Sequence, residues 1–278
     1  MQTNTPPQTQ IRLTRRGRTA LIAIGATVAV TAVAVPLLIL EHEEEARVSL
    51  VIPEGWRASR IYRAVDKALR LPPGSTRKSL AKAHLDLPKA AHGNPEGYLF
   101  PATYPIHEQE TPQSLLKYMV DTAKKRFSHG TITAGSQYNP MSAYQTLTMA
   151  SIVQSEAATK EDMGKVARVI VNRMRRGMPL QMDSTLNYAM DRFTLDTTMG
   201  DTRIDSPYNT YRRVGLPPTP IANPGTDALR AVLSPTPGDW LYFVTVKPGD
   251  TRFSATYDEH LRNVEEFNRL RASASPSH

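Results

Sequence analysis

The segment Thr19–Leu40 constrains this chain most, because it contains no charged residue along its whole length. At a rise of about 1.5 Å per residue, a helix of this length spans the roughly 30 Å hydrocarbon core of a bilayer. Four arginines cluster before it, and acidic residues follow from Glu41. The positive-inside rule then places residues 1–18 in the cytoplasm and residues 41–278 on the other side of the cell membrane. We therefore expect a single-pass anchor that carries an extracytoplasmic globular part.

A cleaved signal peptide is the alternative interpretation of this segment. The apolar run is longer than a typical signal-peptide core, and its small residues are followed by further apolar residues rather than by a polar mature start. We favour the uncleaved transmembrane helix, over residues 19–40.

Composition removes several classes of site. The chain has no cysteine, so disulfides, thiolate metal sites and cysteine nucleophiles are excluded. Its seven histidines are scattered without H-E-x-x-H spacing, and no G-x-S-x-G elbow or phosphate-binding glycine loop occurs. We therefore expect no metal and no cofactor. The net charge of +8 suits any anionic polymer, but the expected topology argues against a nucleic-acid partner.

After the anchor, the pattern predicts a small strand–helix–helix unit. A strand is expected over Val48–Ile52, a helix over Ala58–Leu71, and a second short helix over Thr76–His84. The unit suits a LysM-like α/β subdomain over residues 41–92, whose motifs are weak. A packing subdomain without a ligand explains the pattern equally well.

Residues 93–270 are expected to form a second, mixed α+β domain, so the fold class is α+β. It opens with Asn94–Tyr104, whose aromatic residues either stack on sugar rings or, as we favour, pin a linker. Trp240–Thr245 predicts a strongly buried strand, and Tyr257–Leu270 a closing helix. Residues 271–278 read as a disordered tail.

The centre of this domain is Leu147–Tyr188, which contains two amphipathic helical patterns. In the first, Met149, Ile152, Val153 and Glu156 fall at i, i+3, i+4 and i+7, so a carboxylate lies on an apolar stripe. Burying a charge costs free energy, and such a position usually has a functional reason. The C-terminal end of the helix dipole and the apolar neighbours both raise the pKa of Glu156, as a general acid near neutral pH requires.

The segments that follow these helices are rich in amides, hydroxyls and aromatic rings. Met178–Tyr188, Ser206–Tyr211 and Gly215–Gly225 are read as loops whose composition suits a polyhydroxylated sugar polymer. Ordinary turn chemistry explains their prolines and glycines, but explains the density of Tyr and Asn poorly. Proximity to Glu156 makes six residues candidates for substrate binding: Gln181, Asp183, Thr185, Tyr208, Asn209 and Tyr211.

A glycosidase normally needs two carboxylates. Here one glutamate lies on an apolar face, and Asp183, in an expected loop, is the best second candidate. One carboxylate suffices if the substrate supplies the nucleophile. In peptidoglycan the C6 hydroxyl of muramic acid can attack the anomeric carbon and close a 1,6-anhydro ring.

Several motifs carry a family resemblance in order along the chain: ASIVQSEA, VNRMRRGMPLQMDST, SPYNTY, GLPPTPIANPG, WLYFV and FSATYDEH. They resemble the endolytic murein transglycosylases of the MltG/YceG-like family over roughly Val48–Asn268, and NPEGYLFPATY is similar to that family's interdomain signature. The family's catalytic glutamate falls on Glu156. Many members carry a second glutamate at the position of Gln154, whose replacement here points to Glu156 as the acid/base.

The resemblance implies a membrane-anchored lyase that cuts the MurNAc–GlcNAc β-1,4 bond of nascent peptidoglycan strands. Such an enzyme leaves 1,6-anhydro-MurNAc ends, limits strand length and works beside peptidoglycan synthases, the penicillin-binding proteins. Two alternatives stay open: a hydrolytic muramidase that uses water, and a catalytically inactive glycan-binding scaffold of the synthesis machinery.

Overall fold

The computed structural model describes residues 48–128, 141–193 and 197–274. The expected tail, residues 1–18, and the expected anchor, residues 19–40, lie outside them and stay predictions. Among the described residues, no helix is long and apolar enough to span a bilayer. The described elements are helices and two small antiparallel sheets, which confirms the mixed α+β class.

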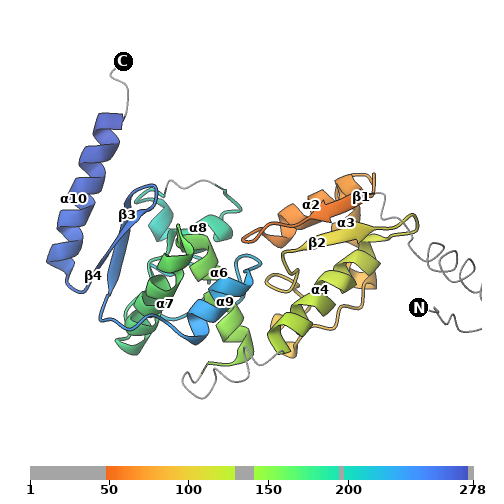
Figure 1. Ribbon diagram of the computed structural model, residues 1–278, viewed down its shortest axis with the longest axis horizontal. Helices are drawn as coiled ribbons and strands as arrows, with labels where there is room; N and C mark the ends of the chain where they lie inside the picture. The colour runs from red at the N-terminus through yellow and green to blue at the C-terminus, as the bar shows by residue number, and fades with distance from the viewer. Residues whose placement is uncertain (1–47, 129–140, 194–196, 275–278) are drawn as a thin grey trace, which may run out of the picture. The chain divides into compact units, whose positions relative to one another are not determined.

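The first sheet pairs β1 (Val48–Val51) with β2 (Thr103–Ile106), and Leu50 lies opposite Tyr104. The chain between the two strands forms α2 (Ala58–Ala68), α3 (Ser75–Ser79) and the short 3-10 helices η1 (Leu80–Lys82) and η2 (Lys89–Ala91). These elements lie together in Figure 1. The boundary expected at residues 92/93 separates the two strands of this sheet, so it does not follow the hydrogen bonding.

Helix α2 forms where its periodicity predicts, and both α2 and α4 (Pro112–Ser128) bury one apolar face. Ile61 and Val65 of α2 are fully buried, one helical turn apart. On α4 the residues with no exposed surface are Leu115, Leu116, Met119, Val120 and Ala123. Lys117 and Lys124, elsewhere on α4, are exposed, so the helix has one buried and one solvated face.

Helix α6 (Ala143–Glu156) lies at the centre of the second half of the fold, against α7 (Lys160–Arg175) and α9 (Thr226–Leu233). Ser142 and Gln145 begin it with a reciprocal capping box. Every residue from Thr146 to Val153 is buried, so the prediction of a single apolar stripe on α6 is wrong. Packing from several sides explains the difference. The hydroxyls of Thr148 and Ser151 donate to carbonyls of the same helix, that of Ser151 to the Thr148 carbonyl at 2.7 Å, whereas the Tyr144 hydroxyl is buried without a partner among the described residues.

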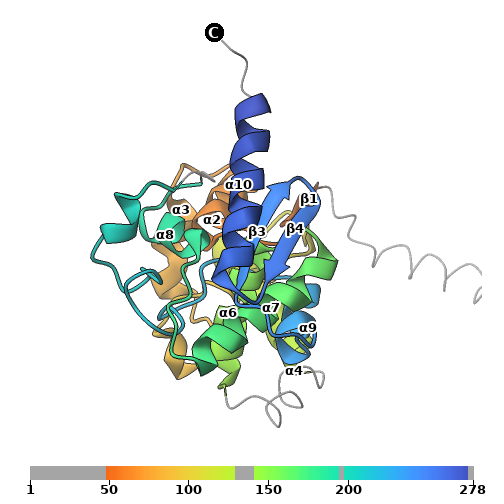
Figure 2. The ribbon, with the colours of Figure 1, turned by 90° about the vertical axis from the view of Figure 1, so that its left-hand side faces the viewer.

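The second sheet is a hairpin of β3 (Tyr242–Lys247) and β4 (Asp250–Ser254), covered by α10 (Tyr257–Ala274) as Figure 2 shows. The strand begins two residues later than expected, and only Val246 of β3 is fully buried. Residues 242–245 stay partly exposed because they line a cavity. Helix α10 extends to Ala274, so residues 271–274 of the expected tail are helical.

Asn223 joins the first sheet region to the second half of the chain. It is fully buried, and its Oδ1 accepts a hydrogen bond from the Leu99 amide at 2.8 Å. Its Nδ2 donates to the Trp56 carbonyl at 2.9 Å and to Glu96 Oε1 at 3.0 Å. Its backbone carbonyl accepts from the Gly55 amide at 2.8 Å. One side chain and its backbone thus hold three segments that are distant in sequence.

Gly97 provides a test of this junction. Its φ is +87°, and a Cβ at this position would lie 2.7 Å from Pro220 Cγ and 3.2 Å from Leu147 Cδ2. Gly93 has a similar φ of +78° but no atom within 4 Å of the corresponding Cβ. We predict that Gly93→Ala lowers the free energy of unfolding by about 1 kcal/mol from backbone strain alone. Gly97→Ala adds a steric cost of roughly 1–3 kcal/mol. Urea unfolding of both variants measures the difference, and equal losses would contradict the close packing.

Candidate active site

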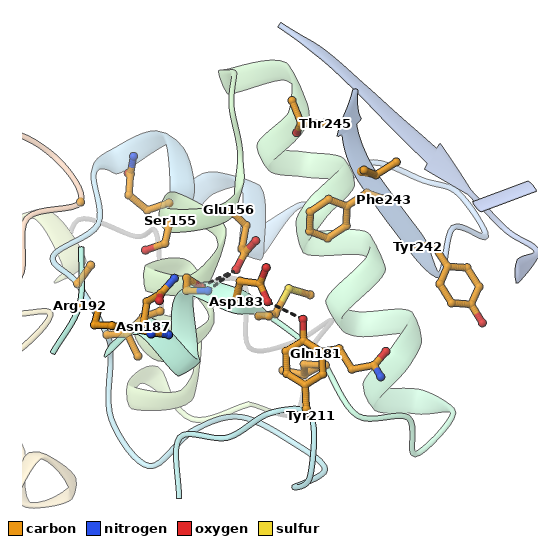
Figure 3. A pocket seen from close by; sticks show the side chains of 18 of the residues that line it. Ser155, Glu156, Gln181, Asp183, Asn187, Arg192, Tyr211, Tyr242, Phe243 and Thr245 are labelled. Carbon is orange, nitrogen blue, oxygen red and sulfur yellow. Dashed lines mark hydrogen bonds between the residues drawn. The ribbon is translucent and has the colours of Figure 1, made fainter. Parts of the chain in front are cut away.

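Glu156 is the last residue of α6 and lines a cavity of about 930 Å³. The cavity walls come from segments far apart in sequence: the turn before α2, the 180–184 segment, β3 and α10. Figure 3 shows the Glu156 carboxyl group directed toward the first turn of α8 (Asp183–Ala189). Met178–Tyr188, expected as a loop, is therefore partly helical, and Asp183 is the first residue of that helix.

Ser184 holds the Glu156 carboxylate through two hydrogen bonds to Oε1. The amide of Ser184 donates at 3.1 Å and its hydroxyl at 2.5 Å. These bonds favour the charged form and by themselves lower the pKa of Glu156. Burial is the larger influence, and the negative charge of Asp183 adds to it, so the pKa of Glu156 is raised. The direction agrees with the sequence prediction, although desolvation rather than the helix dipole is the main cause.

Asp183 lies beside Glu156 in the same cavity and has its own partner. The Tyr211 hydroxyl donates to Asp183 Oδ1 at 2.5 Å, and Figure 3 shows the two side chains facing each other. Burial and the Asp183 carboxylate together raise the pKa of Tyr211, so the phenol keeps its proton. The two carboxylates therefore differ in surroundings: a serine hydroxyl and amide hold Glu156, whereas a phenol holds Asp183.

Gln181 also lines the cavity. Its backbone adopts the left-handed region, with φ of +54°, and its amide donates to the Thr210 carbonyl at 2.9 Å. Its side-chain Oε1 accepts from Arg173 Nη1 at 3.2 Å. The structure thus brings Gln181, Asp183 and Tyr211 together with Glu156.

The other three predicted residues are held in the protein and are not among the described residues that line this cavity. Thr185 is fully buried and its hydroxyl bonds the Met182 carbonyl at 2.7 Å. Asn209 Nδ2 bonds the carbonyls of Thr202 and Ile204, which fastens the loop before α9. Tyr208 packs on the Tyr188 ring, 5.0 Å between centroids, and its hydroxyl lies 3.0 Å from that of Thr219.

Gln154, two residues before Glu156, has a packing role. Its Oε1 accepts a hydrogen bond from the Gly225 amide at 2.9 Å, at the start of α9. A glutamate oxygen could accept the same bond, so a glutamine here keeps the tie between α6 and α9.

Glu96 is a buried carboxylate that the sequence pattern did not single out. It is 3% exposed and accepts hydrogen bonds from the Ala58 amide at 2.9 Å, Asn223 Nδ2 at 3.0 Å and the Tyr188 hydroxyl at 3.3 Å. Desolvation raises the pKa of Glu96 to about 7, against these bonds and the charge of Arg57. It lies in a non-periodic segment, so no helical or strand spacing marks it as buried.

The turn before α2, with the first turn of that helix, supplies a cavity wall that sequence reasoning also missed. Trp56, Arg57 and Arg60 line the cavity, and the Arg60 guanidinium lies 4.1 Å from the centroid of the Trp56 ring. Arg57 donates to the Asn187 carbonyl at 3.2 Å and lies over the Phe193 ring at 4.5 Å. Within the described residues, no group of three or more histidine, aspartate or glutamate side chains could hold a metal ion.

A glutamate with a raised pKa in a cavity lined by aromatic, amide and cationic side chains is typical of enzymes that use general acid–base catalysis. Comparison of the sequence then gives the family. The model of the YceG-like family matches residues 29–266, so the chain belongs to this family, and the resemblance of its motifs is confirmed.

Curated relatives and a solved structure agree with this family. The chain is 39% identical over 173 residues to a Bacillus subtilis protein named endolytic murein transglycosylase; the match covers 62% of this chain and 48% of that protein. A Streptococcus pneumoniae D39 protein of the same name is 39% identical over 177 residues, covering 62% and 32%. The chain therefore spans half or less of these relatives. A crystal structure of a YceG-like protein from Listeria monocytogenes is 30% identical, with a TM-score of 0.67, and covers 77% of this chain and 75% of that one.

Glu96 makes stability depend on pH. Because its pKa rises from 4.5 to about 7 on folding, the folded chain holds this proton more tightly than the unfolded chain does. The resulting stabilisation is full below about pH 4.5 and is lost as pH rises through about 7. We predict that the free energy of unfolding falls by about 3 kcal/mol from this group between pH 4.5 and pH 8, and that Glu96→Gln removes that share. Urea unfolding across this range measures it. The exposed Glu161→Gln serves as the control and follows the wild type, whereas parallel profiles for Glu96→Gln and wild type would contradict the assignment.

Proposed function

We propose that this chain is a membrane-anchored endolytic lytic transglycosylase of peptidoglycan. The observation that carries the proposal is Glu156, a glutamate with a raised pKa whose carboxyl group faces a cavity of about 930 Å³ lined by polar and aromatic side chains. The names of the relatives from Bacillus subtilis and Streptococcus pneumoniae support the substrate, and the YceG-like family supports the reaction class.

In the proposed reaction, protonated Glu156 donates its proton to the glycosidic oxygen of a MurNAc–GlcNAc β-1,4 bond. The bond between the MurNAc anomeric carbon and that oxygen breaks, and the GlcNAc leaves with a hydroxyl group. The C6 hydroxyl of the same MurNAc forms the new bond to the anomeric carbon and gives its proton to the Glu156 carboxylate. The product is a 1,6-anhydro-MurNAc end, and Glu156 regains the proton it started with.

Ser184 suits a residue that must act first as acid and then as base. Its two hydrogen bonds stabilise the carboxylate that forms when the proton leaves, while burial favours the protonated state before reaction. Because burial and the hydrogen bonds act in opposite directions, the free-energy difference between protonated and ionised Glu156 is smaller than burial alone would make it. In this reaction Ser184 is a positioning residue.

Hydrolysis by water is the second candidate, and Asp183 favours it. Asp183 lines the cavity beside Glu156 and would be the second carboxylate that a muramidase needs. The Tyr211 hydroxyl occupies one Asp183 oxygen, which weakens it as a nucleophile or base. We therefore assign Asp183 to substrate binding and prefer the lyase. An inactive glycan-binding scaffold is the third alternative, and the presence of Glu156 in the cavity, held by Ser184, speaks against it.

Product analysis tests these alternatives. We predict that the full-length chain in detergent converts nascent glycan strands to products with anhydro ends, each lighter by one water than a reducing end. Glu156→Gln is expected to lower the rate by about 10²–10⁴-fold, whereas Asp183→Asn retains the anhydro product and Glu161→Gln retains the rate. Reducing ends would identify a muramidase, and equal rates for Glu156→Gln and wild type would remove Glu156 from the mechanism.

The proposal includes the expected topology. Residues 19–40 would cross the cell membrane once, with residues 1–18 in the cytoplasm and the catalytic part outside, beside penicillin-binding proteins that extend the strands. We predict that protease added to spheroplasts digests the segment after residue 41 and leaves the N-terminal tail protected. Inverted vesicles serve as the control and give the opposite pattern; protection of the catalytic part in spheroplasts would contradict this orientation.

A further inference from the structure

Arg173 of α7 places a buried cation in the wall of the same cavity. It is 6% exposed. Its Nε donates to the Leu241 carbonyl at 2.6 Å, and its Nη1 to the Leu180 carbonyl at 2.8 Å and to Gln181 Oε1 at 3.2 Å. Within the described residues, Arg173 forms no ion pair and its Nη2 makes no hydrogen bond. Nε and Nη1 thus hold the segment before β3 and the 180–181 segment, and Nη2 is the nitrogen that stays available to a ligand.

A buried guanidinium without a counter-charge is costly, because carbonyl dipoles replace only part of its hydration. Other arginines of the cavity wall are compensated differently. Arg192 pairs with Asp201 at 2.8 Å, and Arg57 lies 4.0 Å from Asp191. Among the described arginines that line the cavity, Arg173 is the one that is buried and has no carboxylate partner. A bound anion would supply the missing counter-charge.

Tyr242 and His260 extend this part of the wall. The Arg173 guanidinium lies 5.1 Å from the centroid of the Tyr242 ring. The His260 ring stacks on the same Tyr242 ring, with 5.2 Å between the two centroids. His260 Nδ1 is buried and has no hydrogen-bond partner in the described part of the chain. All three residues line the cavity, from α7, β3 and α10 respectively. His260 Nδ1 and Arg173 Nη2 are therefore two nearby groups that could each bond a ligand.

We infer that Arg173, Tyr242 and His260 form a subsite for a carboxylate group carried by the glycan strand. The inference rests on the proposed function, because it names which substituent of that substrate the cavity selects. Peptidoglycan offers this chemistry from two sources: the carboxylates of the stem peptide, and the lactyl carboxylate of MurNAc where the peptide has been removed. Arg173 bonds Gln181, three residues before Ser184, which holds the Glu156 carboxyl group, so one short segment connects the subsite to the acid.

The experiment compares three substrates with the full-length chain in detergent: strands whose stems carry free carboxylates, the same strands with those carboxylates converted to amides, and strands stripped of stems by an amidase. Arg173→Gln is expected to raise KM roughly tenfold on the carboxylate-bearing substrate that the wild type prefers, since a charge-assisted hydrogen bond is lost. Because Arg173 also holds the segment before β3 and the 180–181 segment, loss of that support lowers activity equally on all three substrates. The ratio of KM on amidated strands to KM on carboxylate-bearing strands should therefore fall about tenfold, and this ratio is the readout. Preference for stem-bearing or stripped strands identifies the source of the carboxylate.

Arg168→Gln is the matched control. Arg168 lies on the same helix and also bonds carbonyls, those of Thr236 and Pro235, but it is not among the residues that line the cavity. It should leave KM unchanged on all three substrates. An equal loss by Arg173→Gln on all substrates with the KM ratio unchanged, or a loss confined to kcat, would show a purely structural role and overturn the inference. A wild type without preference among the substrates would overturn it too.

Two further variants decide the matter if Arg173→Gln does not fold. Tyr242→Phe removes the phenol hydroxyl and His260→Phe removes the ring nitrogens, and each should raise KM about two- to fivefold on the carboxylate-bearing substrate alone. No change in either variant would overturn the subsite. Failure of the proposed function is distinguishable, since the wild type would then cleave none of the strands. In that case the binding of full-length Glu156→Gln to the three strands is measured. Preference for carboxylate-bearing strands, lost on adding Arg173→Gln, supports the subsite, and equal binding overturns it.

Discussion

The Glu156 carboxyl group is subject to two opposing effects, and the elements around it are arranged to supply both. Burial at the end of α6 favours the protonated acid, while the amide and hydroxyl of Ser184 favour the carboxylate. The first effect requires that α6 be packed on every side, which α7 and α9 provide. The second requires that the first turn of α8 lie against the end of α6. The rest of the second half of the chain holds these two helices in place.

The same cavity depends on residues from the first sheet region. Glu96 and Asn223 connect the start of α2 to the segment before α9. The turn before α2 brings Trp56 and Arg57 to the cavity wall, and the first turn of α2 brings Arg60. A buried carboxylate at a junction of this kind costs free energy when it is charged. Its hydrogen bonds to an amide, an asparagine and a tyrosine partly offset that cost, and they fix the geometry of the junction.

The sequence predicted most of what depends on local periodicity and on the family. The helices α2, α7 and α10, the strand β3 and the motifs of the YceG-like family follow this pattern. Local patterns fail where burial comes from distant segments. Helix α6 is buried all round, α8 forms in a segment read as a loop, and β2 pairs with β1 across the expected domain boundary. The sequence pattern did not mark Glu96, because its burial comes from residues more than thirty positions away.

The sequence by itself determined the absence of thiol chemistry, the uncharged N-terminal run, the helix that carries Glu156 and its place at the helix end. These follow from residue identity and from spacing along one element. Only the tertiary structure decided which polar residues meet Glu156. It brought Gln181, Asp183 and Tyr211 to the cavity and added Ser184 and Arg173. The side chains of Thr185, Tyr208 and Asn209 instead form hydrogen bonds within the protein. The physical reason is that hydrogen-bond partners and desolvation depend on contacts between segments distant in sequence, which no local pattern encodes.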